Sequence, residues 1–319
     1  MKHYTHLTSE QRYYIYLSHA NGNKVVDIAR TIGVHRSTIY RELRRNGTEN
    51  GKYVWCKAQE KADKRKHTTS RNRAKPVELM WRVRQMITEN DWSPEQISGV
   101  LLKENIRISK QCIYNHIHKD TTGELAKHCR HGARRKVRHR TKHVTKATNI
   151  KNRTSIHNRP ADADDKHFGN FEMDLIVDRK GHSILTIVER STCYLLMAMV
   201  PDGKKSSSVA RVAYRLLFPY RDKIYTLTTD NGSEFAQHEW LAQKLHLRQP
   251  IYFTDSFCSW QKGCVENTNK LIRQYIPKGV DISMLSPGFI DSVQKRLNAR
   301  PRKKLKFNTP KALYFKYFI

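Results

Sequence analysis

The chain has 319 residues, of which 38% are hydrophobic, so it can form two or three domains with buried cores and is not a disordered basic tail. Lysine and arginine number 60 against 29 acidic residues, and the formal net charge is +31 at pH 7. This excess predicts a polyanion as partner. The N-terminal residues lack the apolar core of a signal peptide, and we expect neither secretion nor a membrane span.

Six cysteines form no CxxC pair, which favours reduced thiols in a cytoplasmic protein. A zinc site is an alternative use, although the spacing of its candidate ligands matches no standard pattern, and histidines in a basic chain also suit phosphate. Its candidates are Cys112, His116, His118, His128, Cys129 and His131.

Residues 1–56 are predicted to form a helix-turn-helix domain. Thr8, with a glutamine three positions later, has the signature of a capping box that opens a helix. A second short helix, residues 25–32, ends in a tight turn at a glycine, and a third helix begins at residue 35 or 36. This order and spacing are typical of a helix-turn-helix.

The start of the third helix would enter the major groove of double-stranded DNA, so its residues are candidates for base or phosphate contacts. The alternative is a plain three-helix domain with a solvated basic face. The predicted DNA-binding residues here are His35, Arg36, Ser37, Thr38, Arg41, Arg44 and Arg45.

A basic helical connector, residues 57–75, leads to a second helix-turn-helix-like domain, residues 76–128. In it, WSPEQISGVLL predicts a helix capped by Ser93, and ISKQCIYNHIH predicts another. The segments STIYREL, residues 37–43, and QCIYNHI, residues 111–117, share an Ile-Tyr pair. We therefore expect two related units. The pattern favours DNA contact by the second, with protein contact as the alternative.

Residues 129–165 are predicted to be a basic linker. From residue 130 to residue 153 the chain has ten lysines or arginines and no acidic residue. Such a run does not fold alone, and it suits either contact with phosphates or a solvated tether. The acidic segment PADADD that follows, residues 160–165, is assigned to a loop and not to a metal site.

Residues 166–280 are predicted to form a mixed α/β domain, because a run of three strands is followed by alternating helices and strands. A basic C-terminal helical extension, residues 281–319, follows. We expect its charges to contact DNA, with simple packing on the domain as the alternative. Strands are expected at about 171–177, 183–189, 194–200, 224–229 and 251–253, and helices at 206–217 and 234–245.

Three carboxylates lie in different local contexts within the α/β domain. Asp174 sits in FEMDLIVD, where apolar residues alternate as in a strand with one buried face, and its side chain points away from that face. Asp230 closes a strand, and Glu266 lies in a helix, four and seven positions before Lys270 and Arg273. Carboxylates from strands and a helix suit hard cations such as Mg²⁺.

Other acidic residues near these positions are weaker candidates. Glu172 points the same way as Asp174 in an ideal strand, so it is the main alternative ligand. Glu234 is expected to support the first turn of the helix that follows Asp230.

The sequences FEMDLIV, TTDNGSEF, WQKGCVENTNKLIRQYIPKG and LNARPRKKL together resemble the catalytic domain of DDE transposases and retroviral-type integrases, most closely the insertion sequence 30 family. The resemblance implies a multidomain α and α/β protein, in which helix-turn-helix domains precede a ribonuclease H-like mixed α/β catalytic domain. It further implies that Asp174, Asp230 and Glu266 are the catalytic residues and the metal ligands. Lys270 and Arg273 would then bind DNA phosphate.

A transposase of this kind would bind the terminal inverted repeats of an insertion sequence and transfer DNA strands with Mg²⁺, or with Mn²⁺ in its place. Its partners would be double-stranded end and target DNA and at least one further copy of the chain, and it would be cytoplasmic and nucleoid-associated on DNA. Two alternatives are a catalytically idle DNA-binding regulator and a sequence-independent nuclease of the same fold.

Overall fold

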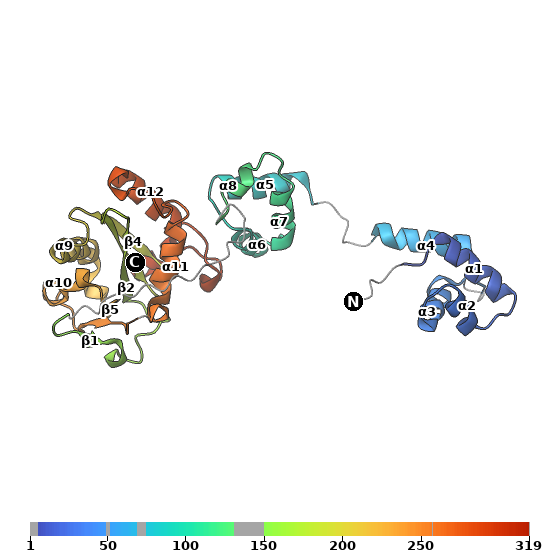
Figure 1. Ribbon diagram of the computed structural model, residues 1–319, viewed down its shortest axis with the longest axis horizontal. Coiled ribbons are helices and arrows are strands. Elements are labelled where there is room, and N and C mark those ends of the chain that lie inside the picture. Colours follow the sequence, from blue (N-terminus) through green and yellow to red (C-terminus); the bar gives the residue numbers. More distant parts are fainter. Residues whose placement is uncertain (1–5, 49–51, 69–74, 131–149, 257, 319) are drawn as a thin grey trace. The chain divides into compact units, whose positions relative to one another are not determined.

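The computed structural model describes two compact units, one within residues 1–77 and one within residues 78–319 (Figure 1). Among these described residues, none of the helices is both long and apolar enough to cross a membrane. The central part of the predicted basic linker, residues 131–149, lies outside the described residues. Those described are residues 6–48, 52–68, 75–130, 150–256 and 258–318.

The first unit is helical, and its first helix begins as predicted, because Thr8 and Gln11 form a complete capping box. Gly33 has a φ of 71°, a left-handed conformation that suits glycine in the tight turn before the third helix. Ile15, Ile28 and Ile39, one from each of the first three helices, meet in the core. The helices are α1 (Ser9–Ala20), α2 (Val25–Thr31), α3 (Arg36–Asn46) and α4 (Trp55–Thr68).

The second unit begins with a smaller helical module. Ser93 caps one of its helices through a capping box with Gln96, and Pro94 occupies the first helical position, as the sequence predicts. The preceding helix, which supplies Val83 and Ile87 to the module's core, was not predicted. The helices are α5 (Val77–Thr88), α6 (Pro94–Lys103), α7 (Lys110–His118) and α8 (Glu124–Lys127).

A six-stranded sheet forms the centre of the second unit, with strand order β1-β6-β5-β2-β3-β4. Strands β2, β3 and β4 form an antiparallel meander, and β5 and β6 continue from β2 in parallel. This meander with parallel strands beside it is the ribonuclease H-like arrangement. The strands are β1 (Thr154–Ser155), β2 (Asn170–Val177), β3 (Ser183–Glu189), β4 (Leu195–Val200), β5 (Thr226–Thr229) and β6 (Ile251–Phe253).

Helices cover both faces of this sheet (Figure 1). On one face Phe171 and Met173 pack with residues of α9 (Ser206–Leu217) and α10 (His238–Lys244). The other face packs against α11 (Gly263–Ile272) and α12 (Pro287–Asn298). The expectation of one buried face for β2 is therefore wrong, because Ile176 and Glu172 are buried on the α11 side.

Helix α12 covers the edge of the sheet at β4. The Asn298 side chain bonds both backbone groups of Leu195 in β4, each at 2.8 Å, and Gln294 accepts from the Met197 N–H at 2.6 Å. These amides satisfy backbone groups that an edge strand would otherwise expose. Beyond α12, the short helix α13 (Pro310–Tyr314) stacks Tyr314 on Tyr194, with 3.9 Å between ring centroids.

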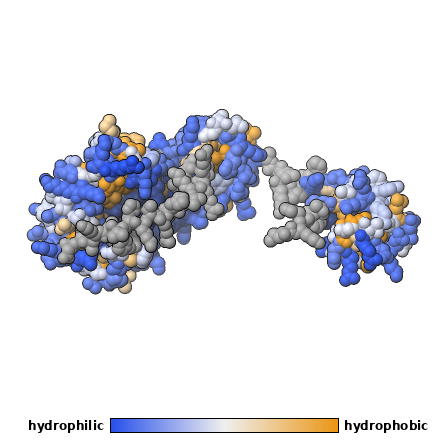
Figure 2. Space-filling model, in the orientation of Figure 1, coloured by the Kyte–Doolittle hydropathy of each residue, from blue (hydrophilic) through white to orange (hydrophobic). Residues whose placement is uncertain are grey.

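The helix predicted at 234–245 is shorter in the structure. A 3₁₀ turn at Ser233–Phe235 follows Asp230, and α10 begins only at His238. The surface in view is mainly hydrophilic, with small hydrophobic patches (Figure 2), which agrees with the high charge of the chain.

Candidate active site

Asp174 and Asp230 lie on adjacent parallel strands. Glu172 of β2 is the register partner of Thr228 of β5, so the same register two residues further on sets Asp174 beside Asp230. Asp230 follows the last residue of β5, and its Oδ1 accepts the Gly232 N–H at 3.1 Å, which forms the turn after the strand. Parallel pairing therefore brings together two carboxylates that are far apart in the sequence.

The ammonium of Lys262 bridges these two carboxylates. Its Nζ lies 3.3 Å from Asp174 Oδ1 and 2.9 Å from Asp230 Oδ2, and it also donates to the Met173 carbonyl at 3.2 Å. Lys262 is buried, whereas the side chains of Asp174 and Asp230 are 26% and 40% exposed to solvent. A single cation is therefore held among three oxygens at this position.

Glu266 belongs to the same neighbourhood through α11, which packs against β2 and β3. Asn269, one turn after Glu266, donates from Nδ2 to Asp174 Oδ2 at 2.7 Å. The Glu266 carboxylate pairs with Lys270 at 2.8 Å, and both side chains are exposed. Arg273 ends the helix and donates to the Ile276 carbonyl at 3.4 Å. The expected alignment on one helix is thus present for Glu266 and Lys270, whereas Arg273 is the C-cap residue and contacts the segment after α11.

Glu172 is used differently from the carboxylates around Lys262. It is buried, accepts the Val265 N–H at 2.8 Å and pairs with Arg190 Nε at 3.1 Å. Val265 lies in the first turn of α11, so Glu172 satisfies a free N–H at the positive end of that helix. Burial raises the pKa of Glu172, partly opposed by these contacts. This residue fixes the position of α11.

The charges around Lys262 hold one another in place. Burial raises the pKa of Asp174, the neighbouring Asp230 carboxylate raises it further, and Lys262 lowers it. Burial lowers the pKa of Lys262, but the two aspartates outweigh this and raise it overall. Two adjacent carboxylates with hard oxygen atoms, neutralised here by an ammonium, suit a divalent cation, because the same oxygens favour Mg²⁺-like ions.

A different cluster meets the geometric requirement for three close ligands. Within the described part of the chain, only Asp178, His182 and Asp281 offer ligand atoms that all lie within 4.8 Å of one another. Asp178 Oδ2 accepts from the Ile282 N–H at 2.9 Å, and Asp281 pairs with Lys180 at 2.7 Å. These oxygens therefore join the β2–β3 turn to the segment before α12.

The alternative zinc site is not assembled among the described residues. His128 contacts Asp91 at 2.8 Å, and His131 lies outside the described residues. The acids of PADADD also contact protein groups: Asp164 with His167, Asp165 with Lys304, and Asp162 with the Tyr225 hydroxyl.

The predicted DNA-binding residues of the first unit lie on α3. His35 is its N-cap and accepts the Ser37 N–H, and Arg41 donates to the Ser37 hydroxyl at 3.3 Å. Thr38 and Arg41 also line a cavity of about 900 Å³, which Lys66 of α4 borders. Among the described residues, the arginines of α3 have no carboxylate partner; they are Arg36, Arg41, Arg44 and Arg45.

Sequence reasoning did not include Lys262 in the site. The signal was present, because Lys262 lies four positions before Glu266, but α11 begins only at Gly263 and Lys262 belongs to the preceding 3₁₀ turn, Ser259–Lys262. Its approach to Asp174 depends on the sheet and not on helical spacing. Asn269 of α11 also contacts Asp174, through its side-chain amide.

Similarity to known proteins shows the class of protein to which this chain belongs. Residues 3–46 match the family described as a helix-turn-helix domain. The chain is 38% identical over 312 residues to the transposase for insertion sequence element IS4351 of Bacteroides fragilis, covering 96% of this chain and 94% of that protein. It is 33% identical to the transposase for insertion sequence element IS1086 of Cupriavidus metallidurans, covering 96% and 93%.

Transposase InsI for insertion sequence element IS30A of Escherichia coli is 32% identical, covering 97% of this chain and 83% of that protein. The catalytic core domain of BIV integrase is 19% identical, covers 46% of this chain and 94% of that one, and has a TM-score of 0.36. These sequence identities extend over nearly the whole chain, and they identify the protein as an insertion-sequence transposase. The chain belongs to the insertion sequence 30 family, whose members are DNA-cutting and joining enzymes that generally use a divalent metal.

Proposed function

We propose that this chain binds the terminal inverted repeats of its insertion sequence as at least a dimer and catalyses Mg²⁺-dependent strand cleavage and strand transfer. Asp174, Asp230 and Glu266 are the catalytic residues in this proposal. The observation that carries it is the pairing of Asp174 and Asp230 on adjacent strands, with a cation between them and α11 attached through Asn269. The protein would act in the cytoplasm, associated with the nucleoid.

The three carboxylates would hold Mg²⁺, with Mn²⁺ as the alternative ion. A metal ion held there would lower the pKa of a bound water and stabilise the leaving oxygen of a phosphodiester. Lys262 would be displaced from the carboxylates by the divalent cation and left free to neutralise DNA phosphate. Lys270 and Arg273, further along α11, would orient the DNA backbone.

The reaction requires no covalent bond to the protein. Water attacks a phosphodiester at the end of the element, and the bond to the 3′ oxygen breaks to free a 3′-hydroxyl. This hydroxyl then attacks a phosphodiester of target DNA in line, the bond from that phosphorus to the target's 3′ oxygen breaks, and the released target end carries a new 3′-hydroxyl. The active-site residues position the phosphates in both steps, and the arginines of α3 select the DNA end.

The test is strand cleavage and strand transfer on labelled DNA that carries the element's own ends, with Mg²⁺, for the intact protein and for Glu266→Gln. This substitution keeps the size of the side chain and removes its charge. Glu234→Gln serves as the matched control, because Glu234 is a nearby glutamate outside the proposed ligand set. We expect the intact protein and the control to nick and join DNA, and Glu266→Gln to bind DNA only.

Each alternative has its own outcome in the same assay. If all three proteins bind the ends and none cuts with Mg²⁺ or Mn²⁺, the proposal is wrong and the protein is a regulator. If the intact protein cuts random DNA as readily as the element's ends, it is a sequence-independent nuclease. Retained cleavage in Glu266→Gln would remove Glu266 from the site.

A further inference from the structure

A cavity of about 850 Å³ lies beside α11 in the second unit. Cys264 and Asn267, which lie close to Glu266 in the sequence of α11, form part of its wall. The helical module contributes residues at the start of α6 and Tyr114 of α7, and the segment after α12 contributes Arg300 and Arg302. The cavity and the proposed active site therefore share one helix.

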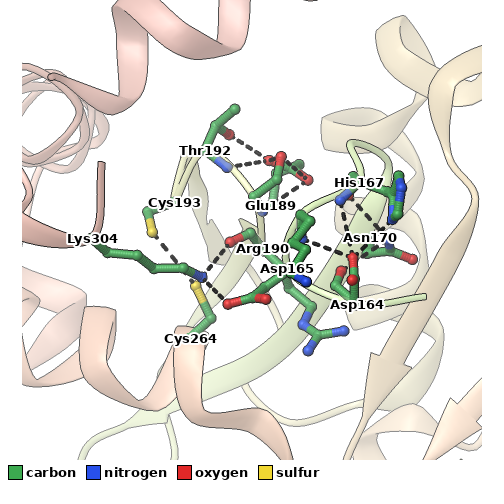
Figure 3. A network of polar contacts seen from close by, with 12 residues as sticks. Asp164, Asp165, His167, Asn170, Glu189, Arg190, Thr192, Cys193, Cys264 and Lys304 are labelled. Atoms are coloured by element: carbon green, nitrogen blue, oxygen red, sulfur yellow. Dashed lines mark hydrogen bonds and ion pairs between the residues drawn. The ribbon is translucent and has the colours of Figure 1, made fainter. Parts of the chain in front are cut away.

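The acidic residues of this cavity are already neutralised. There are four acidic residues, and each forms an ion pair with a different basic side chain at 2.8–3.1 Å. Figure 3 shows the pair of Lys304 with Asp165, next to Cys264. Every acidic side chain of the lining therefore already has a basic partner, and only the charge of Asp91 also acts on Arg300, whose pKa it raises. The pairs are Asp91 with Arg296, Glu95 with Lys303, Asp165 with Lys304, and Glu172 with Arg190.

Arg300 and Arg302 carry positive charge without a carboxylate partner among the described residues. They are only 2% and 8% exposed, and the Nε of each is buried without a hydrogen-bond partner. Arg300 donates to Gln274 and to the Tyr275 hydroxyl, and Arg302 donates to the Leu297 carbonyl. Each guanidinium has five N–H donors, so most of this capacity is unused by the protein.

The environment of these arginines favours an added anion. Burial lowers the pKa of Arg302 to about 10, and the pKa of Arg300 is lowered for the same first reason. Both remain charged at neutral pH, and Arg130 at the cavity adds a third positive group. Adjacent buried cations without counter-charge are costly, and a phosphate that bonds to two guanidinium groups offsets that cost.

We propose that this cavity binds a backbone phosphate of a DNA strand, held by Arg300 and Arg302, with the adjoining base stacked on Trp260. Trp260 lines the same cavity, is 72% exposed and lies in the same 3₁₀ turn as Lys262. An exposed indole beside clustered arginines is the combination that holds unpaired nucleotides. The inference rests on the proposed function in taking DNA as the polyanion, and it places a second strand contact beside the carboxylates.

The experiment follows the iodoacetamide modification of Cys264, which lines the cavity, in the full-length protein without divalent metal. Peptide mass spectrometry measures the rate with and without a short single-stranded oligothymidylate, and separately with inorganic pyrophosphate. The variants are Arg302→Gln, Arg302→Lys and Trp260→Ala. Lys311→Gln is the matched control, because Lys311 is an exposed base of the same C-terminal segment outside the cavity.

We expect oligothymidylate to slow modification of Cys264 in the intact protein, in Arg302→Lys and in the control. Arg302→Gln should require about tenfold more oligothymidylate for the same protection, because it loses charge-assisted hydrogen bonds. Trp260→Ala should also weaken protection, and since Trp260 is exposed this variant tests the cavity even if Arg302→Gln does not fold. Pyrophosphate should protect far less, because it has no base to stack on Trp260.

Unchanged protection in Arg302→Gln and Trp260→Ala would overturn the inference. Strong protection by pyrophosphate that oligothymidylate does not displace would also overturn it, because the site would then take a free anion. The metal-free readout separates this inference from the proposed function. Protection in a protein that fails to transfer strands would refute only the function, and strand transfer without protection would refute only the cavity site.

Discussion

Glu42 in the first unit and Asp91 in the second helical module each make several polar contacts, but with different parts of the chain. In the first unit, buried Glu42 pairs with Arg12 Nε at 2.8 Å and accepts from the Tyr53 hydroxyl at 3.1 Å. In the second module, Asp91 contacts Tyr275 and Arg296, both at 3.0 Å. Glu42 therefore connects residues within its own module, whereas Asp91 connects its module to the α/β domain.

The difference extends to the surfaces of the two modules. The arginines of α3 have no carboxylate partner among the described residues, whereas the second module places Gly99 of α6 directly against the ring of Phe307. A Cβ at Gly99 would lie 2.3 Å from that ring, so any larger residue would require the Phe307 ring to shift. The second module therefore packs against the C-terminal segment of the chain, and Lys110 of its α7 remains exposed.

The largest expected effect comes from breaking the internal pair of the first unit. Glu42→Ala leaves the buried Arg12 without its partner and should destabilise helices α1–α4 by about 3 kcal/mol. Hydrogen exchange followed by mass spectrometry, which reports peptides separately, should show faster exchange in α1–α4 and no change in the sheet. Tyr53→Phe, which keeps the ion pair, is the control, and equal exchange in Glu42→Ala and the intact protein would contradict this prediction.

The next effect concerns the surface of α3. Arg41→Gln should weaken binding to the element's ends by about tenfold, because one base or phosphate contact of arginine is worth roughly 1–3 kcal/mol. Fluorescence anisotropy with end DNA measures it. Arg30→Gln on α2 is the matched control, since Arg30 is exposed and already pairs with Asp27. If both variants lose affinity equally, α3 is not the recognition helix.

The secondary structure was predictable where local chemistry decides it. The helix caps at Thr8 and Ser93 and the extents of β2 and β3 depend on residues within one turn or one strand. The two-residue strand β1 was missed because its only support is pairing with β6, about a hundred residues away. Helix α5 was missed because no Ser, Thr, Asp or Asn stands directly before its first residue in the sequence.

The candidate site was predictable in its residue types but not in its contacts. Asp174, Asp230 and Glu266 were selected from local context and from family resemblance. That Lys262 joins Asp174 to Asp230 follows from the parallel pairing of β2 with β5, which no local pattern encodes. Likewise, the sequence alone suggests that Arg300 and Arg302 lie at the surface, whereas the structure buries both.

A smaller effect should follow from loosening the second module. Asp91→Asn keeps a hydrogen-bond acceptor and suits the left-handed φ of 54° at this position, but it removes the charge that faces Arg296. We expect a loss of about 1–2 kcal/mol in protection of α5–α8 from hydrogen exchange. Glu95→Gln, which breaks only the exposed pair with Lys303, should cost less than about 1 kcal/mol. Equal losses would mean that Asp91 does not attach the module.

The smallest expected effect tests whether α7 still contacts DNA. Lys110 is an exposed base in the first turn of α7, and Gln111 and Asn115 beside it bond to each other at 3.0 Å. If Lys110 neutralises one phosphate, Lys110→Gln should weaken end DNA and random DNA equally, by about twofold to fivefold, and reduce the salt dependence of binding by about 0.9 in log–log slope. Anisotropy titrations at several salt concentrations measure both quantities. An unchanged slope would restrict α7 to protein contact, and a loss confined to end DNA would make α7 a second recognition helix.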